Sequence, residues 1–154
     1  MSPNQISTDR IERQVRLNAA RDQVWLALTD TREFGQWFGV ELSGAVAPGA
    51  KLRGPITSEG YEHVTFEATV ETVEQEKRYS FRWHPYAIEP GVDYSSEPTT
   101  LVAFALEEIE GGTLLTVVES GFNGIPASRR AKAFEMNSKG WAIQLESIER
   151  HLAA

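Results

Sequence analysis

The sequence predicts an α+β fold in which an antiparallel sheet carries one long helix. Between residues 10 and 122, stretches of alternating apolar and polar residues are separated by turns that contain glycine or proline, as in consecutive antiparallel strands. From residue 126 to residue 152, apolar residues recur at spacings of three, four and seven, which places them on one face of a helix. Helices segregated from the strands of an antiparallel sheet define the α+β class.

Composition sets limits on the organisation and partners of the chain. The 154 residues suffice for one domain, which we assign to residues 10–154, after a flexible N-terminus over residues 1–9. The absence of cysteine excludes disulfides and thiolate metal sites. A formal net charge of −7 argues against nucleic acid, whose phosphates need a clustered basic face. No apolar run approaches the roughly 20 residues of a membrane span, so we expect a cytoplasmic protein.

The first strand and two short helices open the predicted domain. Residues 10–17 alternate, with Ile11, Val15 and Leu17 on the face that we expect to be buried. Asn18 is a candidate N-cap for a helix over residues 20–29. A second short helix is expected over residues 32–38, after Asp30.

The predicted sheet has about six to seven strands. After the first, strands are expected over residues 40–44, 51–57, 64–73, 77–84, 100–109 and 113–122. Pro55 indicates an edge strand or a bulge, and Val73 breaks the alternation, so that a bulge is expected just before it. Residues 85–98 form the longest irregular segment, which we interpret as a surface crossover in preference to a lid.

The last helix is predicted to cover the sheet. It starts either with Pro126 as the first helical residue or with Ser128 as the N-cap. A helix this long with one apolar stripe needs a broad apolar surface, and the strand that carries Tyr79, Phe81 and Trp83 on one face is the densest part of that surface. The gap between this helix and the sheet is therefore the candidate working site.

Short motifs in a fixed order carry a resemblance to a known family. The motifs are Val24-Trp25, Phe34-Gly35-Gln36-Trp37, Thr99-Thr100-Leu101-Val102-Ala103-Phe104, Gly111-Gly112-Thr113, Glu119-Ser120-Gly121-Phe122 and Gly140-Trp141. In this order and spacing the chain resembles the START-like (SRPBCC) superfamily from residue 10 to its end. Within the superfamily it is similar to the branch of the C-terminal domain of the activator of Hsp90 ATPase. The resemblance implies the helix-grip fold, a curved antiparallel sheet around the long C-terminal helix with an apolar cavity between them.

The resemblance also implies which side chains face that cavity. The candidate ligand-binding residues are Phe66, Tyr79, Phe81, Trp83, Phe104, Val117, Glu119, Phe134, Trp141 and Leu145. Glu119 is a carboxylate on an apolar face, so it is a candidate general acid or base. The preferred interpretation is a structural glutamate satisfied by a tryptophan N–H, an arginine or water. Gly140 either leaves room for a ligand or lets the helix approach a strand.

The sequence and the resemblance together suggest three functions. The first is binding of a small apolar or amphipathic molecule, with no cofactor or metal, because no histidine lies at metal-ligand spacing from a second ligand. The second is an enzyme of the cyclase type that uses Glu119, since the superfamily includes such catalysts. The third is an Hsp90-type co-chaperone or a stress-related interaction domain. We rank the co-chaperone last, because the eukaryotic activator contacts its chaperone through an additional N-terminal domain for which this chain has no room.

Overall fold

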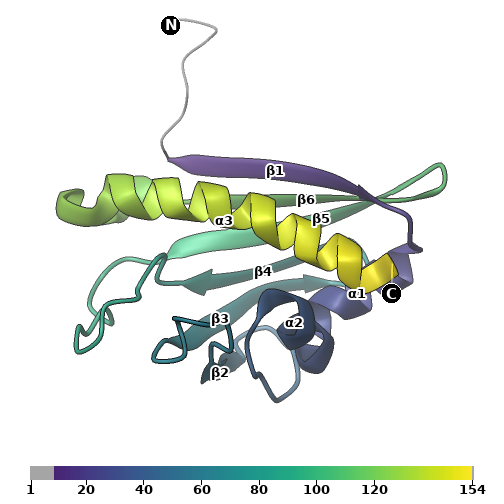
Figure 1. Ribbon diagram of the computed structural model, residues 1–154. Coiled ribbons are helices and arrows are strands. Elements are labelled where there is room, and N and C mark those ends of the chain that lie inside the picture. The colour runs from purple at the N-terminus through teal and green to yellow at the C-terminus, as the bar shows by residue number, and fades with distance from the viewer. Residues whose placement is uncertain (1–8, 154) are drawn as a thin grey trace, which may run out of the picture.

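The computed structural model describes residues 9–153 and confirms the α+β helix-grip architecture. In chain order the elements are β1 (Arg10–Leu17), α1 (Arg21–Thr29), α2 (Thr31–Phe38), β2 (Lys51–Pro55), β3 (Thr65–Glu74), β4 (Arg78–Trp83), β5 (Thr100–Ile109), β6 (Gly112–Ser120), the 3₁₀ turn η1 (Phe122–Gly124) and α3 (Ala127–Ala153). The strands form one antiparallel sheet in the order β1-β6-β5-β4-β3-β2. Helix α3 lies across one face of this sheet (Figure 1).

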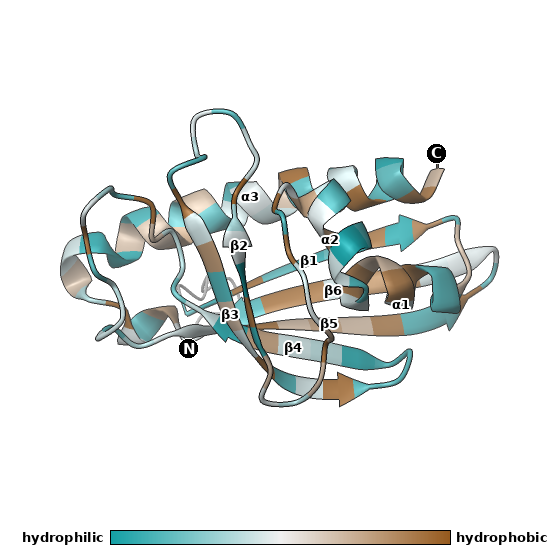
Figure 2. Cartoon of the chain, turned by 90° about the horizontal axis from the view of Figure 1, so that it is seen from below, coloured by the Kyte–Doolittle hydropathy of each residue, from teal (hydrophilic) through white to brown (hydrophobic). Residues whose placement is uncertain are grey.

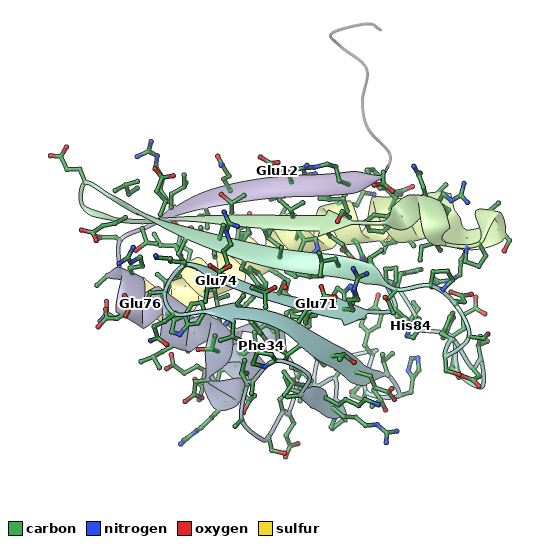
Figure 3. The ribbon with its side chains drawn as sticks, turned by 180° about the vertical axis from the view of Figure 1, so that it is seen from behind. Glu12, Phe34, Glu71, Glu74, Glu76 and His84 are labelled. Atoms are coloured by element: carbon green, nitrogen blue, oxygen red, sulfur yellow. The ribbon has the colours of Figure 1, made fainter. Side chains whose placement is uncertain are left out.

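All three helices cover the same face of the sheet, so the molecule has two layers (Figure 2). Helices α1 and α2 connect β1 with β2, the two edge strands. The other face of the sheet is open to solvent and displays charged side chains such as Glu12 and Glu71, which are exposed (Figure 3). The buried side chains therefore lie between the sheet and the helices.

Alternation places the core side chains on the inner face of each strand. In β5 and β6, Val102, Phe104, Leu115 and Val117 are all buried. The predicted bulge in β3 is confirmed, since its pairing with β4 shifts register between Val70 and Thr72. Ser80 Oγ accepts a hydrogen bond from the Thr72 backbone N–H at 3.1 Å, which satisfies a donor next to the bulge.

Local chemistry fixes the ends of α2. The Asp30 carboxylate accepts hydrogen bonds from the backbone N–H groups of Arg32 and Glu33, two donors that have no partner inside the helix. Gly39 ends the helix in a left-handed conformation, with φ of 92°, that disfavours side chains with a Cβ. This short helix is the one predicted after Asp30.

Two expectations in the first half of the chain are wrong. Residues 40–44 form no strand. Only Val40 makes an isolated bridge, to Ile56, and the two hydrogen bonds of this bridge are Glu41 N–H to the Pro55 carbonyl and Thr57 N–H to the Gly39 carbonyl. Asn18 does not cap α1. The helix follows Ala20, whose backbone N–H donates to the Gln23 side chain at 3.1 Å.

Two boundaries near the last helix also differ from expectation. Strand β6 ends at Ser120, and Gly121 turns the chain at φ of 98°, so Phe122 enters the core from η1 instead of extending the strand. Helix α3 begins at Ala127, so neither predicted start is correct. The Pro126 carbonyl accepts the first helical hydrogen bonds, and Ser128 lies inside the helix.

The described chain begins at Asp9, which bonds to the turn after β6. Of the predicted flexible N-terminus, residues 1–8 lie outside the described residues. The carbonyl of Asp9 accepts hydrogen bonds from the backbone N–H groups of Gly121 and Phe122. Within residues 9–153 no helix combines the length and apolarity that crossing a membrane requires.

Candidate functional site

The candidate site lies where α3 crosses the ends of β4, β5 and β6. Trp141 and Leu145 on α3 are buried against the sheet. Asn137 lies one helical turn before Trp141 and therefore shares its face. Thr100 and Trp83 are direct partners in the β4–β5 ladder. The adjacent pair in the β5–β6 ladder, Val102 opposite Glu119, brings Glu119 next to them.

Glu119 is fully buried at the centre of this arrangement and accepts hydrogen bonds from four side chains. Oε2 accepts from Trp83 Nε1 at 2.7 Å and from Thr100 Oγ1 at 2.6 Å. Oε1 accepts from Trp141 Nε1 at 2.9 Å, and Asn137 Nδ2 bonds both oxygens at 2.9 and 3.2 Å. The donors come from β4, β5 and α3, so one carboxylate on β6 joins the helix to the sheet.

All four partners of Glu119 are uncharged. An indole N–H can only donate a hydrogen bond, and an ionised carboxylate can only accept, so the partners match the group they surround. Among the described residues, Glu119 makes no ion pair with a lysine, arginine or histidine. A buried carboxylate is tolerated only with such a complete set of donors. This geometry agrees with the structural interpretation of Glu119, satisfied by tryptophan N–H groups, and leaves no carboxylate oxygen open to a substrate.

Aromatic rings occupy most of the gap between helix and sheet. Phe34, Phe38, Phe66, Phe81, Trp83, Phe104 and Trp141 form a continuous cluster in which neighbouring ring centroids lie 4.9 to 6.5 Å apart. These are the separations of aromatic pairs in direct contact. In the gap where the family resemblance implies an apolar cavity, a small pocket lies at the margin of this cluster.

That pocket has a volume of about 150 Å³ and lies between α2, β4 and α3. It is lined by Phe38, Trp83, Asn137, Gly140, Trp141 and Gln144. A Cβ added at Gly140 would meet no atom within 4 Å, so this glycine leaves space and does not bring the helix close to a strand. Phe38 and Trp83 are only partly buried, so the pocket communicates with solvent.

The two amide side chains in the pocket wall have fixed orientations. Asn137 directs its amide nitrogen to Glu119, and Gln144 Nε2 donates to the Phe38 carbonyl at 2.9 Å. Both partners are acceptors, so the nitrogen and oxygen of each amide are assigned by the network. The carbonyl oxygens of both side chains and the second N–H of Gln144 are the amide groups left for a ligand.

A larger depression of about 710 Å³ lies at the opposite end of the strands, beside the β5–β6 hairpin. It is lined by residues 18–23 together with Glu76, Glu108, Ile109, Gly111 and Gly112. None of the predicted ligand-binding residues lies there. Its walls lack the aromatic rings of the smaller pocket, so the smaller pocket is the better candidate site.

The comparison with protein families identifies the chain. Residues 18–153 match the family described as activator of Hsp90 ATPase homolog 1-like protein. The chain belongs to this family. The match covers α1, α2, α3 and every strand of the sheet except β1, and it agrees with the START-like superfamily that the sequence motifs indicate. No curated protein sequence gives a significant match.

Solved structures of family type share this fold. DynU16, encoded in the dynemicin biosynthetic locus, is 31% identical with a TM-score of 0.72, and the alignment covers 95% of this chain and 48% of that one. This chain thus spans about half the length of DynU16. MLL2253 from Mesorhizobium loti is 24% identical with a TM-score of 0.73, over 94% and 96% of the two chains. The Aha1 dimer from Colwellia psychrerythraea is 18% identical with a TM-score of 0.70, over 93% and 95%, a similarity of fold alone.

In this member of the Hsp90-activator family the predicted site residues separate into three groups. Trp83 and Trp141 line the pocket, and Glu119 lies directly behind them. Phe134 packs against Phe122, with ring centroids 5.3 Å apart, away from the pocket. The others are buried in the core: Phe66, Tyr79, Phe81, Phe104, Val117 and Leu145.

Four residues of the site were missed by sequence reasoning. Thr100 continues the inward alternation of Val102 and Phe104, so the period of two could have identified it. Asn137 precedes Trp141 by four residues, and a helical period could have placed it on the same face. Phe38 and Gln144 gave no comparable signal, because only the packing of α2 against α3 brings them together.

Burial changes the acid–base chemistry of one predicted residue. Tyr79 is buried in the core, and its ring stacks on Phe104 with centroids 6.1 Å apart. Loss of water around the phenolate raises the pKa of the Tyr79 hydroxyl well above its ordinary value. Tyr79 therefore stays neutral at physiological pH and supplies packing to the site.

Proposed function

We propose that this protein binds a small apolar or amphipathic molecule in the pocket between α2, β4 and α3. The observation that carries the proposal is a solvent-connected space of about 150 Å³ whose walls are aromatic rings with two oriented amides. Ligand sites are typically apolar with a few placed polar groups. Apolar cavities of about this size bind single aromatic rings in other proteins, so a one-ring molecule, or the ring of a larger one, fits.

The surroundings of Glu119 also support binding without catalysis. The carboxylate of Glu119, the predicted acid or base of the cyclase alternative, is fully buried and occupied by four donors. A general acid or base must come within hydrogen-bond reach of its substrate, and these donors separate Glu119 from the pocket. We expect the protein to act in the cytoplasm.

Intrinsic fluorescence tests the proposal, because Trp83 and Trp141 line the pocket. The probes are benzyl alcohol, benzylammonium and benzoate, each with one aromatic ring. At least one is expected to give a saturable change in tryptophan emission. Gly140→Leu is expected to abolish that change, because its side chain would project into the space beside the helix.

Gly140→Ala is the matched control, since a single methyl group leaves most of the pocket open. It is expected to keep binding within a few-fold of the parent protein. The proposal is overturned if no probe gives a saturable signal, or if Gly140→Leu binds as tightly as Gly140→Ala.

The family match keeps a chaperone partner as a second candidate. An Hsp90-type ATPase would then hydrolyse ATP faster when this protein is added. The Gly140→Leu variant separates the two functions. A chaperone effect that survives this substitution would be independent of the pocket, whereas ligand binding would be lost.

A further inference from the structure

We infer that the pocket selects an organic cation, a small molecule with an ammonium group next to an aromatic or apolar body. This inference rests on the proposed function and names the class of ligand for the same pocket. Three features of the pocket point the same way: its aromatic walls, the buried carboxylate behind them, and the two amide oxygens.

The aromatic walls form a triangle of rings. The ring centroids of Phe38, Trp83 and Trp141 lie 6.0 Å, 6.3 Å and 6.0 Å apart in pairs, and all three rings line the pocket. A cation within about 6 Å of an aromatic centroid is attracted by the negative face of the ring, most strongly by tryptophan. Because these three rings also contact one another, a cation would lie against them in the pocket and not between them. Sites that recognise organic ammonium groups in other proteins use several rings.

The buried carboxylate supplies a negative charge without a positive partner. Glu119 is hydrogen-bonded to three of the pocket's own wall residues, Trp83, Asn137 and Trp141, so it lies one side-chain layer behind the ligand space. Its donors are neutral and leave the charge uncompensated. Attraction between charges is stronger in the poorly solvated interior than in water. No lysine, arginine or histidine is among the residues that line the pocket.

The amide oxygens in the pocket wall also favour a ligand that donates hydrogen bonds. The nitrogens of Asn137 and Gln144 are already bonded to Glu119 and to the Phe38 carbonyl. Both carbonyl oxygens remain as acceptors, which suit the N–H groups of an ammonium, although the second N–H of Gln144 also remains as a donor. An anionic ligand would meet the negative charge of Glu119 and two oxygen acceptors, so the same walls disfavour carboxylates.

The test compares three probes of nearly equal size: benzylammonium, benzyl alcohol and benzoate. Tryptophan fluorescence is titrated at pH 7 and constant ionic strength. Benzylammonium is expected to bind at least about tenfold more tightly than benzyl alcohol, with benzoate weakest. Benzyl alcohol binding as tightly as benzylammonium, or more tightly, overturns the inference while leaving the proposed function intact. Failure of all three probes overturns both.

Two variants test whether the carboxylate and the aromatic rings cause the preference for a cation. Glu119→Gln removes the charge but keeps the rings, and it is expected to lower the affinity ratio of benzylammonium to benzyl alcohol several-fold. Because Glu119→Gln can impair folding, Phe38→Leu provides a second measurement, in which loss of one ring lowers the ratio several-fold. Phe34→Leu is the control, because Phe34 stacks on Phe38 with ring centroids 4.9 Å apart but does not line the pocket. Its affinity ratio of benzylammonium to benzyl alcohol is expected to equal that of the parent protein. A parental ratio in both folded Glu119→Gln and Phe38→Leu contradicts the inference.

Discussion

Glu119 has a full set of hydrogen bonds and no counter-ion. Hydrogen bonds to a charged group contribute about 1.5–3 kcal/mol each, roughly twice the contribution of bonds between neutral groups. Several such bonds offset the desolvation of a carboxylate that is completely buried. If any one donor is removed, fewer hydrogen bonds offset the desolvation of the Glu119 carboxylate. The stability of the site therefore depends on residues such as Thr100 that never meet a ligand.

Two buried threonines allow the charge on Glu119 to be measured through stability. Thr100 and Thr113 are both fully buried, and each donates one hydrogen bond, Thr100 to Glu119 at 2.6 Å and Thr113 to the Ala19 carbonyl at 2.8 Å. Replacement by valine keeps the shape and removes the hydroxyl. We expect Thr100→Val to lower the free energy of unfolding by about 2 kcal/mol and Thr113→Val by about 1 kcal/mol, because only the first acceptor is charged.

Urea denaturation measures both values, since m is expected to be the same in the two variants. Equal losses for Thr100→Val and Thr113→Val would mean that Glu119 acts as an ordinary neutral acceptor. That result would also remove the electrostatic basis for cation binding.

At the level of elements, two helical glycines have opposite surroundings. A Cβ at Gly140 in α3 would meet nothing within 4 Å, whereas a Cβ at Gly35 in α2 would lie 2.2 Å from the carbonyl oxygen of Val40. Alanine is favoured over glycine inside a helix by about 1 kcal/mol. We therefore expect Gly140→Ala to raise the free energy of unfolding by about 0.5–1 kcal/mol and Gly35→Ala to lower it, because the added methyl group must displace backbone.

Thermal or urea unfolding of the two variants checks this pair, with helix content followed by circular dichroism. A destabilised Gly140→Ala variant would show that the space beside α3 is not open. An unchanged free energy of unfolding in Gly35→Ala would show that the backbone turn after α2 can shift at little energetic cost.

The sequence predicts elements well where one periodicity persists, and poorly where tertiary contacts decide. Strand β5 and the bulge of β3 follow directly from alternation and its interruption. Residues 40–44 also alternate weakly, but they pair with the segment after β2 only at the bridge between Val40 and Ile56. Likewise, Phe38 reaches the pocket only because α2 packs under α3, and no local pattern encodes that contact.

At the scale of the molecule, the distinction between pocket and core was the least predictable feature. The sequence identifies the inward aromatic residues, and the structure buries most of them in mutual contact, with a small space beside Gly140. Interiors are packed to high density, so the positions of a few side chains decide whether a gap remains. Hydrophobic periodicity specifies which face is buried but carries no information on how completely that face is filled.

The same close packing predicts how the whole molecule responds to alkaline pH. Burial raises the pKa of Tyr79 above its ordinary value near 10, whereas in the unfolded chain Tyr79 loses its proton near pH 10. Above pH 10 the native state therefore holds a proton that the unfolded state has released, and stability falls as pH rises. This contribution is fully present below about pH 10 and is lost by up to about 1.4 kcal/mol per pH unit above it.

Tyr79→Phe removes the ionisable hydroxyl but keeps the ring that stacks on Phe104. Urea unfolding at pH 8, 9, 10 and 10.5 is expected to show a smaller loss of stability above pH 10 in Tyr79→Phe than in the parent protein. Tyr61→Phe, at a tyrosine that is 40% exposed, is expected to leave the parental slope. Parallel slopes for the parent and Tyr79→Phe would mean that water reaches the Tyr79 hydroxyl, and so that the core around Tyr79 is less tightly packed than its aromatic contacts indicate.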